Sequence, residues 1–252
     1  DYLVRDAHHT GVPYGTIDHE RLIRELRFAD GQLVLGAGNV QTAESLLVAR
    51  ALMNPTVYTQ HTARISKAML RRATERLLDE TDVTAHEIRR WDDYDLLTEF
   101  RRTDATSEFA RRYDERSLYK RAVWAEYDDV PARVREFDDE QRRAAERAIA
   151  ERCDLDPRAV ILDVERDPEM TESTSTVIVN GEVRRLEDES PLVSALRLTQ
   201  QQRWRLGVYT PEAATDCVGQ AAVEELDLDV DGVPVSEVKE SLHATLDEFE
   251  TE

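Results

Sequence analysis

Two predicted helices carry polar side chains of the types that bind nucleotides. Tyr2 and Asp6 lie four residues apart, on one side of the first predicted helix. Arg50, Tyr58 and His61 share one side of a later predicted helix, again at helical spacing. A guanidinium can hold phosphate, a carboxylate can accept a hydrogen bond from a sugar hydroxyl, and a tyrosine can stack on a sugar or base. These five residues are the candidate substrate-binding site.

The second stripe can also be interpreted without a ligand. It continues to Arg64 and is flanked by Leu46, Leu47 and Val57, so a face typical of a core turns polar in its middle. Burying arginine and histidine there is unfavourable unless they are paired or bind an anion. A solvated helix face with internal salt bridges has the same helical period. The spacing alone therefore leaves both interpretations open.

The elements that would position these residues are mainly helical up to residue 115. Residues 1–10 resemble the end of a helix, closed by Gly11 and Pro13. An Asp30-Gly31 pair between two short alternating runs predicts a β-hairpin, with its first strand within 22–28. A helix from Thr42 to about Leu78 should be kinked or split by Pro55. Thr84, with Glu87 three residues later, predicts a capping box.

After residue 115 the pattern alternates in two-residue steps. Strands are expected over 117–127, 159–164 and 204–209, with a hairpin over 176–186 that turns at Asn180-Gly181. Helices are expected over 138–152, 191–202 and 211–226. The order β-α-β-β-α-β-α predicts an α+β ferredoxin-like domain over 116–228. Residues 229–252 are expected to form an acidic C-terminal tail.

The composition restricts the partners. The chain has 53 acidic and 33 basic residues, a net charge of −20, which argues against nucleic acid. An acidic surface with few lysines is typical of proteins adapted to high salt, although ordinary acidic proteins share it. No apolar run approaches the length of a membrane span. Cys153 and Cys217 form no metal-binding motif, and we expect two small buried thiols in a reducing compartment.

Several segments resemble one enzyme family. The run DYLVRDAHH at residues 1–9 is similar to the DYxxRDxxH segment of HD-domain dNTP triphosphohydrolases, a group that includes the sterile-alpha-motif/HD-domain dNTPase and dGTPase-like enzymes. The similarity covers most of residues 1–210. Its further segments are 11–15, 21–35, 49–53, 57–62 and 91–97, with Arg121 and the 204–209 strand fitting more loosely.

The resemblance implies roles for the candidate residues. Tyr2 and Asp6 would contact a deoxyribose, and Asp6 would accept a hydrogen bond from the 3′-hydroxyl. Arg50 would hold the phosphates, and Tyr58 would pack against the sugar or base. Gln60 stands where many members of the family carry a histidine, which leaves the role of the adjacent His61 open.

The family's metal ligands are a histidine, a His-Asp pair and a later aspartate, none of which matches this sequence. The resemblance places the last of them just upstream of Asp1, so we expect the C-terminal part of an incomplete HD-type helical domain. A divalent metal (Mg, Mn, Fe or Zn) is expected in the complete enzyme and none on this chain, which alone should be inactive. The alternative is a non-catalytic nucleotide-sensing, regulatory or oligomerisation module. A cytoplasmic homo-oligomer that binds a nucleotide is expected in either case.

Overall fold

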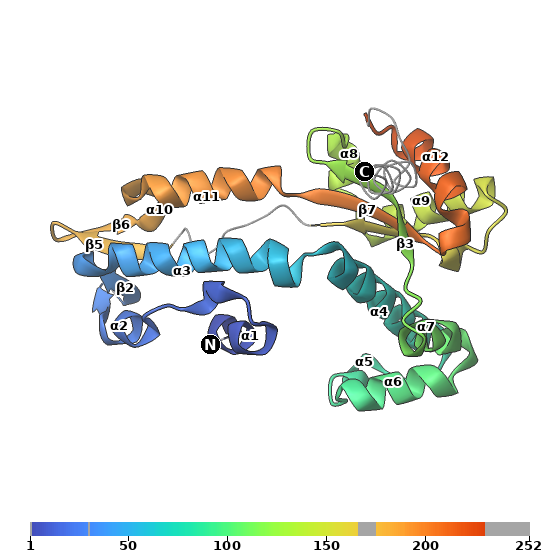
Figure 1. The fold of residues 1–252 in the computed structure, drawn as a ribbon, viewed down its shortest axis with the longest axis horizontal. Coiled ribbons are helices and arrows are strands. Elements are labelled where there is room, and N and C mark those ends of the chain that lie inside the picture. Colours follow the sequence, from blue (N-terminus) through green and yellow to red (C-terminus); the bar gives the residue numbers. More distant parts are fainter. Residues whose placement is uncertain (1, 30, 166–174, 230–252) are drawn as a thin grey trace, which may run out of the picture. The chain divides into compact units, whose positions relative to one another are not determined.

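The chain forms two compact units, each built from two separate segments. The computed structural model describes residues 2–29, 31–165 and 175–229. The first unit comprises residues 1–63 and 167–204, and the second comprises 64–166 and 205–252 (Figure 1). The division therefore differs from the boundary expected at residue 115. Most of the acidic tail, 230–252, lies outside the described residues.

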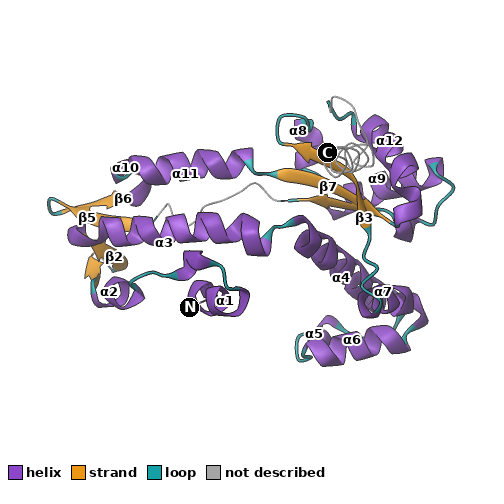
Figure 2. Cartoon of the chain, viewed as in Figure 1, coloured by secondary structure: helices purple, strands orange, loops and turns teal. Residues whose placement is uncertain are grey.

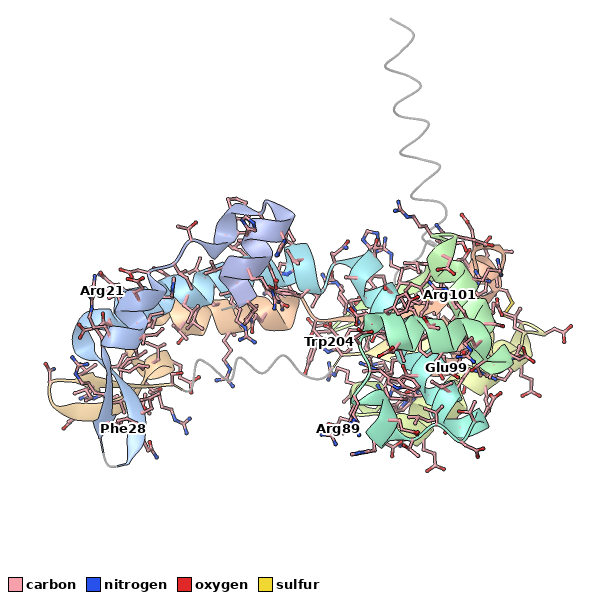
Figure 3. All side chains as sticks on the ribbon, turned by 90° about the horizontal axis from the view of Figure 1, so that it is seen from below. Arg21, Phe28, Arg89, Glu99, Arg101 and Trp204 are labelled. Atoms are coloured by element: carbon pink, nitrogen blue, oxygen red, sulfur yellow. A yellow bond between two sulfur atoms is a disulfide. The ribbon has the colours of Figure 1, made fainter. Side chains whose placement is uncertain are left out.

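The first unit begins with short helices and a hairpin. Helix α1 (Tyr2–Thr10) confirms the predicted first helix and is followed by η1 (Pro13–Gly15). Helix α2 (His19–Arg24) lies where a strand was expected, because the Asp18 side chain accepts the Arg21 N–H and caps a helical turn. The predicted hairpin is formed by β1 (Leu26–Ala29) and β2 (Gln32–Gly36), although Asp30 of its turn lies outside the described residues. Phe28 on β1 is 80% exposed (Figure 3).

The predicted long helix is split at Pro55, as expected. It consists of α3 (Val40–Met53), a π-helical turn η3 (Asn54–Tyr58) and α4 (His61–Glu80). A short turn η2 (Ala37–Asn39) precedes α3. Helices α10 (Leu186–Glu189) and α11 (Pro191–Gln202) complete the first unit, and α11 runs along α3 (Figure 1).

The sheet of the first unit joins strands that are distant in sequence. Its order is β1-β2-β5-β6, where β5 (Thr176–Val179) and β6 (Glu182–Arg185) form the hairpin predicted at Asn180-Gly181. Strands β2 and β5 run parallel, with Leu35 opposite Val177. A ferredoxin-like domain would have the β5–β6 hairpin in the same sheet as β3, β4 and β7. The hairpin instead pairs with β2, so the expected topology is not observed. The pairing cements one core of buried residues: Ala43, Leu47, Val177, Leu186 and Val193.

The second unit holds an antiparallel sheet of order β3-β7-β4 (Figure 2). The strands are β3 (Lys120–Glu126), β7 (Arg205–Thr210) and β4 (Ile161–Val164). Helices α9 (Asp139–Arg152) and α12 (Thr215–Leu226) pack on it and on each other. The remaining elements are α5 (Ala85–Ile88), α6 (Asp93–Arg102), α7 (Asp104–Asp114), α8 (Ala132–Arg135), η4 (Pro157–Ala159) and η6 (Glu212–Ala214). The capping box at Thr84 is present at the start of α5.

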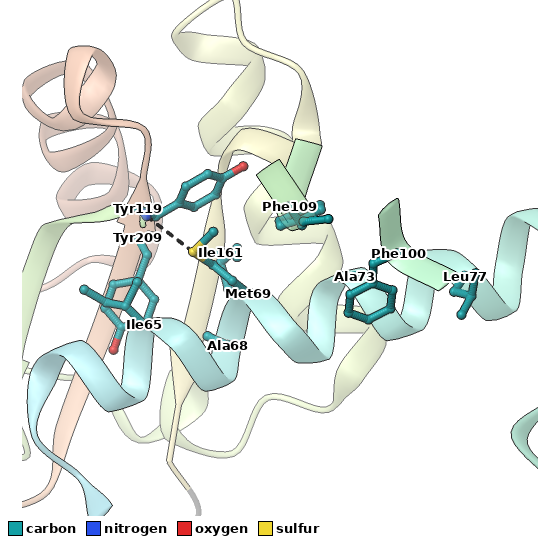
Figure 4. Close-up of a cluster of buried hydrophobic side chains, with 11 residues drawn as sticks. Ile65, Ala68, Met69, Ala73, Leu77, Phe100, Phe109, Tyr119, Ile161 and Tyr209 are labelled. Carbon is teal, nitrogen blue, oxygen red and sulfur yellow. Dashed lines mark hydrogen bonds between the residues drawn. The ribbon is translucent and has the colours of Figure 1, made fainter. Parts of the chain in front are cut away.

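The core of the second unit lies between α4, α7 and the sheet (Figure 4). Tyr209 of β7 is fully buried in it, and the backbone N–H of Tyr119 contacts the sulfur of Met69 at 3.3 Å. Gly207 makes room for the Tyr209 ring, because a Cβ at residue 207 would come within 2.4 Å of the Tyr209 hydroxyl. The mainly helical fold with small sheets is therefore as expected.

Cys153 and Cys217 are bonded to each other, which corrects the expectation of two free thiols. Cys153 follows the last turn of α9, and Cys217 lies in the first turn of α12. The error arose because the packing of α12 on α9 brings together residues 64 positions apart, and no local pattern records that packing. No helix in the described part of the chain is long and apolar enough to cross a membrane.

Candidate nucleotide-binding site

A hydrogen bond joins two of the candidate residues across the first unit. The Tyr58 hydroxyl donates to Asp6 Oδ2 at 2.6 Å. The ring of Tyr2 meets the ring of Tyr58 edge to face, with 5.7 Å between centroids. Three of the five predicted site residues, from α1 and η3, thus form one contact set. Sequence spacing placed them on two stripes, and the fold brings the stripes together.

A small apolar core holds α1 against α3 beneath this contact. Leu3 is 3% exposed and Met53 is fully buried, so α1 presents Leu3 to the helix while Asp6 reaches Tyr58. The alternation of apolar and polar residues in α1 explains how one helix does both. The cluster consists of Leu3, Ala49 and Met53, with Ala7, Val12, Tyr14, Ile17, Leu46, Val57 and Tyr58 packed against it.

The π-helical turn sets the position of Tyr58. Pro55 has no N–H, so it cannot donate to the Ala51 carbonyl as an α-helical residue would. Arg203, which follows α11, instead donates to that carbonyl at 3.0 Å. The Thr59 N–H then bonds to the Asn54 carbonyl at 2.8 Å, five residues back, which is the pattern of a π-turn. The break in the helix is therefore satisfied by a side chain from a distant segment.

The charges around Asp6 favour its ionised form. Arg5 contacts Asp6 Oδ1 at 2.7 Å. The hydrogen bond from Arg5, followed by that from Tyr58, lowers the pKa of Asp6 below its ordinary value. Burial and the bond to Asp6 raise the pKa of Tyr58 to about 12. At neutral pH the pair is thus a carboxylate that accepts and a phenol that donates.

Arg50 and His61 occupy the neighbouring turns. Arg50 is half-buried in the last turn of α3, four residues after Leu46 and three before Met53. It therefore lies along the side of α3 that carries the apolar core with α1. His61 is exposed at the first residue of α4. Their predicted contacts with a nucleotide stay predictions.

The rest of the second stripe has a different role. Arg64, the next member, belongs to the second unit, is 5% exposed and pairs with Asp163 at 2.8 Å. Arg64 is therefore neither on a solvated helix face nor at the candidate site: it is a buried arginine with a carboxylate partner from another element. A stripe defined by spacing alone did not separate a buried ion pair from a ligand contact.

Two further residues bear on the site. Arg5 lies on the same helical stripe as Tyr2 and Asp6, although it was not among the predicted site residues. Arg203 could not have been found, because nothing in the sequence links it to Ala51, 152 positions earlier. Within residues 2–29, 31–165 and 175–229, no cluster of three or more His, Cys, Asp or Glu side chains could hold a metal ion.

The sequence matches a family model described as the HD associated region, over residues 17–237. The chain belongs to the HD-associated region family. The match extends over both units, so each is part of the family's fold. It starts after α1, so it does not include Tyr2 or Asp6.

Curated relatives of this HD-associated chain are longer proteins. An uncharacterized protein of Methanocaldococcus jannaschii is 30% identical over 220 residues, which are 84% of this chain and 48% of that protein. An uncharacterized protein of Bacillus subtilis is 35% identical over 89 residues, which are 34% of this chain and 21% of that protein. The chain spans about half the length, or less, of these relatives.

Two solved structures share the fold. A hypothetical protein from Aquifex aeolicus has a TM-score of 0.65 and 22% identity, covering 88% of this chain and 55% of its own. A phosphohydrolase from Bacteroides thetaiotaomicron has a TM-score of 0.56 and 18% identity, covering 84% of this chain and 60% of its own. At these identities the likeness concerns the fold.

Proposed function

We propose that this HD-associated chain is part of a metal-dependent phosphohydrolase that acts on deoxynucleoside triphosphates. In this proposal the chain supplies the sugar- and phosphate-contacting half of the pocket. The metal ion is held by residues outside the chain, and the protein works as a cytoplasmic homo-oligomer. The Tyr58–Asp6 hydrogen bond is the observation that carries the proposal.

The chemistry of the pair suits a deoxyribose. Asp6 keeps acceptor capacity after binding Arg5 and Tyr58, because a carboxylate offers about four lone-pair sites. A sugar 3′-hydroxyl can donate to one of them. The rings of Tyr2 and Tyr58 supply an apolar wall beside it, against which a sugar can pack. Arg50, on the adjoining turn of α3, brings a guanidinium of the kind that grips phosphate.

The proposal is tested by nucleotide hydrolysis with the complete protein and a divalent metal. Released phosphate or triphosphate is measured for deoxynucleoside and ribonucleoside triphosphates. Arg50→Ala should lower kcat/KM about 10- to 150-fold, because it removes one charge-assisted contact with phosphate. The matched control is Arg24→Ala, which removes an exposed arginine from α2 of the same unit and should leave the kinetics unchanged.

Asp6→Asn tests the sugar contact separately. It should raise KM for deoxynucleotides and reduce the preference over the matching 2′,3′-dideoxynucleotides, because the charged acceptor is lost. Unchanged kinetics in both Arg50→Ala and Asp6→Asn would refute the site. Nucleotide binding without turnover in the complete protein would favour the non-catalytic sensing module instead.

A further inference from the structure

The second unit contains a cleft lined by four arginines. The cleft lies between α4, α9 and β4 and opens to solvent. Arg71 and Arg72 come from α4, and Arg142 and Arg143 come from α9. The chain as a whole carries a net charge of −20, so four guanidinium groups around one cleft depart from its general surface.

The two charged residues at the floor of the cleft are paired with each other. Arg72 and Glu146 are both buried, with side chains 8% and 4% exposed, and lie 2.5 Å apart. Arg72 also donates to the Val160 carbonyl at 3.3 Å, and Glu146 accepts the Leu162 N–H at 2.8 Å. This pair fixes α4 to α9 and β4. The walls of the cleft are therefore formed by helices and a strand rather than by loops.

The rim of the cleft is not neutralised in the same way. Arg143 pairs with Glu75, and Arg142 pairs with Asp139, whose side chain is 87% exposed. Ion pairs as exposed as the second contribute little and are readily exchanged. Arg71 makes no hydrogen bond or ion pair with the residues that the structure describes. Three of the four arginines therefore each have a carboxylate partner, and Arg71 has none among the described residues.

The fourth carboxylate at the cleft is already engaged elsewhere. Asp163 is bound by Arg64 at 2.8 Å and by the Tyr209 hydroxyl at 3.0 Å. It therefore does not serve as the counter-ion of Arg71. The uncompensated positive charge lies on the rim, where solvent and a ligand can reach it.

We propose that this cleft binds a phosphate-type oxyanion through Arg71 and Arg142. One guanidinium group can donate two parallel hydrogen bonds to two oxygens of a phosphoryl group. Arg142 can exchange its exposed partner, Asp139, for such a ligand. The phosphoryl group is that of free phosphate, polyphosphate or a nucleotide. This site is in a different unit from Asp6 and Tyr58 and does not depend on the proposed hydrolysis.

The test is calorimetric titration of the complete protein carrying Arg50→Ala, which should weaken phosphate binding at the proposed substrate site. Orthophosphate, tripolyphosphate and dATP are titrated separately at low salt. Saturable binding is expected, and Arg71→Ala or Arg142→Ala should weaken it by about 10-fold. The matched control is Arg147→Ala, an exposed arginine of α9 outside the cleft, which should change the affinity by less than about 2-fold.

The three ligands distinguish the source of the phosphoryl group. Equal affinities indicate recognition of a single phosphoryl, tighter tripolyphosphate indicates a chain of phosphates, and tighter dATP indicates a nucleotide. Absence of saturable binding by all three, in a protein with an unchanged circular dichroism spectrum, would overturn the proposal. So would an Arg147→Ala variant that loses as much affinity as Arg71→Ala. Neither outcome would affect the hydrolysis test at Asp6.

Discussion

The contact between Asp6 and Tyr58 has a protonation state that experiment can read. The pKa of Tyr58 is raised to about 12 by burial and by the hydrogen bond that its hydroxyl gives to Asp6. Because the folded value lies above the ordinary value of 10.0, the contact stabilises the fold fully below pH 10. That contribution is lost as the pH rises toward 12.

We predict that Tyr58 titrates well above pH 10 in the folded protein. The difference between the ultraviolet titrations of the wild type and Tyr58→Phe isolates this one phenol among the tyrosines. Asp6→Asn should lower the midpoint, because it removes the carboxylate that holds the proton. A midpoint near pH 10 in the wild type, unchanged by Asp6→Asn, would show that the hydrogen bond is absent in solution.

At the scale of residues, the spacing indicated which side chains share one side of a helix but not what they contact. Tyr2, Asp6 and Tyr58 were candidates by residue type and spacing, and in the structure they contact one another. Arg64 was assigned to the same stripe, yet it is buried in an ion pair with Asp163. Spacing defines the side of a helix on which a residue lies, but it does not show which residue or ligand that side chain contacts.

At the scale of elements, the break at Pro55 depends on a partner from another segment. Pro55 leaves the Ala51 carbonyl without its α-helical donor, and Arg203 takes that place. The contribution of Arg203 to stability should therefore depend on whether residue 55 is a proline.

A double-mutant cycle should measure that dependence. We predict that Arg203→Ala lowers the free energy of unfolding by about 1 kcal/mol, the usual contribution of one such hydrogen bond. In a Pro55→Ala background the loss should be smaller, because the restored amide of residue 55 can donate to the Ala51 carbonyl. Chemical denaturation of the four proteins gives the coupling. Equal losses in both backgrounds would mean that Arg203 acts independently of the break.

The disulfide fastens α12 to α9 across a loop of 64 residues. Cross-linking over that length should stabilise the second unit by about 4 kcal/mol through the unfolded chain. We predict that reduction, or Cys153→Ser with Cys217→Ser, lowers the denaturation midpoint accordingly. Reductant added to the double variant is the control and should have no further effect. A midpoint that reductant leaves unchanged in the wild type would contradict the bond in solution.

The sequence predicted elements where the signal was local. The Thr84 capping box, the Asn180-Gly181 turn and the break at Pro55 each depend on a few adjacent residues, and all three are present. It did not predict that β5 pairs with β2, or that the two cysteines meet. Both are consequences of packing between segments more than sixty residues apart. Neither contact produces a recognisable pattern in the local sequence.

At the scale of the whole molecule, the excess of acidic residues should make stability depend on salt. The 53 acidic residues outnumber the 33 basic ones, and this excess negative charge repels itself across a Debye length of roughly 30 Å at 0.01 M salt but about 3 Å at 1 M. We predict a melting temperature that rises from 0.1 to 3 M KCl. Sorbitol at matched water activity is the control for general exclusion effects. A flat or falling melting temperature in KCl would contradict adaptation to high salt.

The parallel pairing of β2 with β5 imposes an order on biosynthesis. The core of the first unit needs Ala43 and Leu47 from its early segment, and Val177, Leu186 and Val193 from its late one. On the ribosome, the whole 64–166 segment is made between them, which takes roughly 5 to 20 seconds at ordinary elongation rates. During that interval the apolar side of α3 has no partner strand. We therefore expect the nascent chain to be most exposed to aggregation while its second unit is still being synthesised.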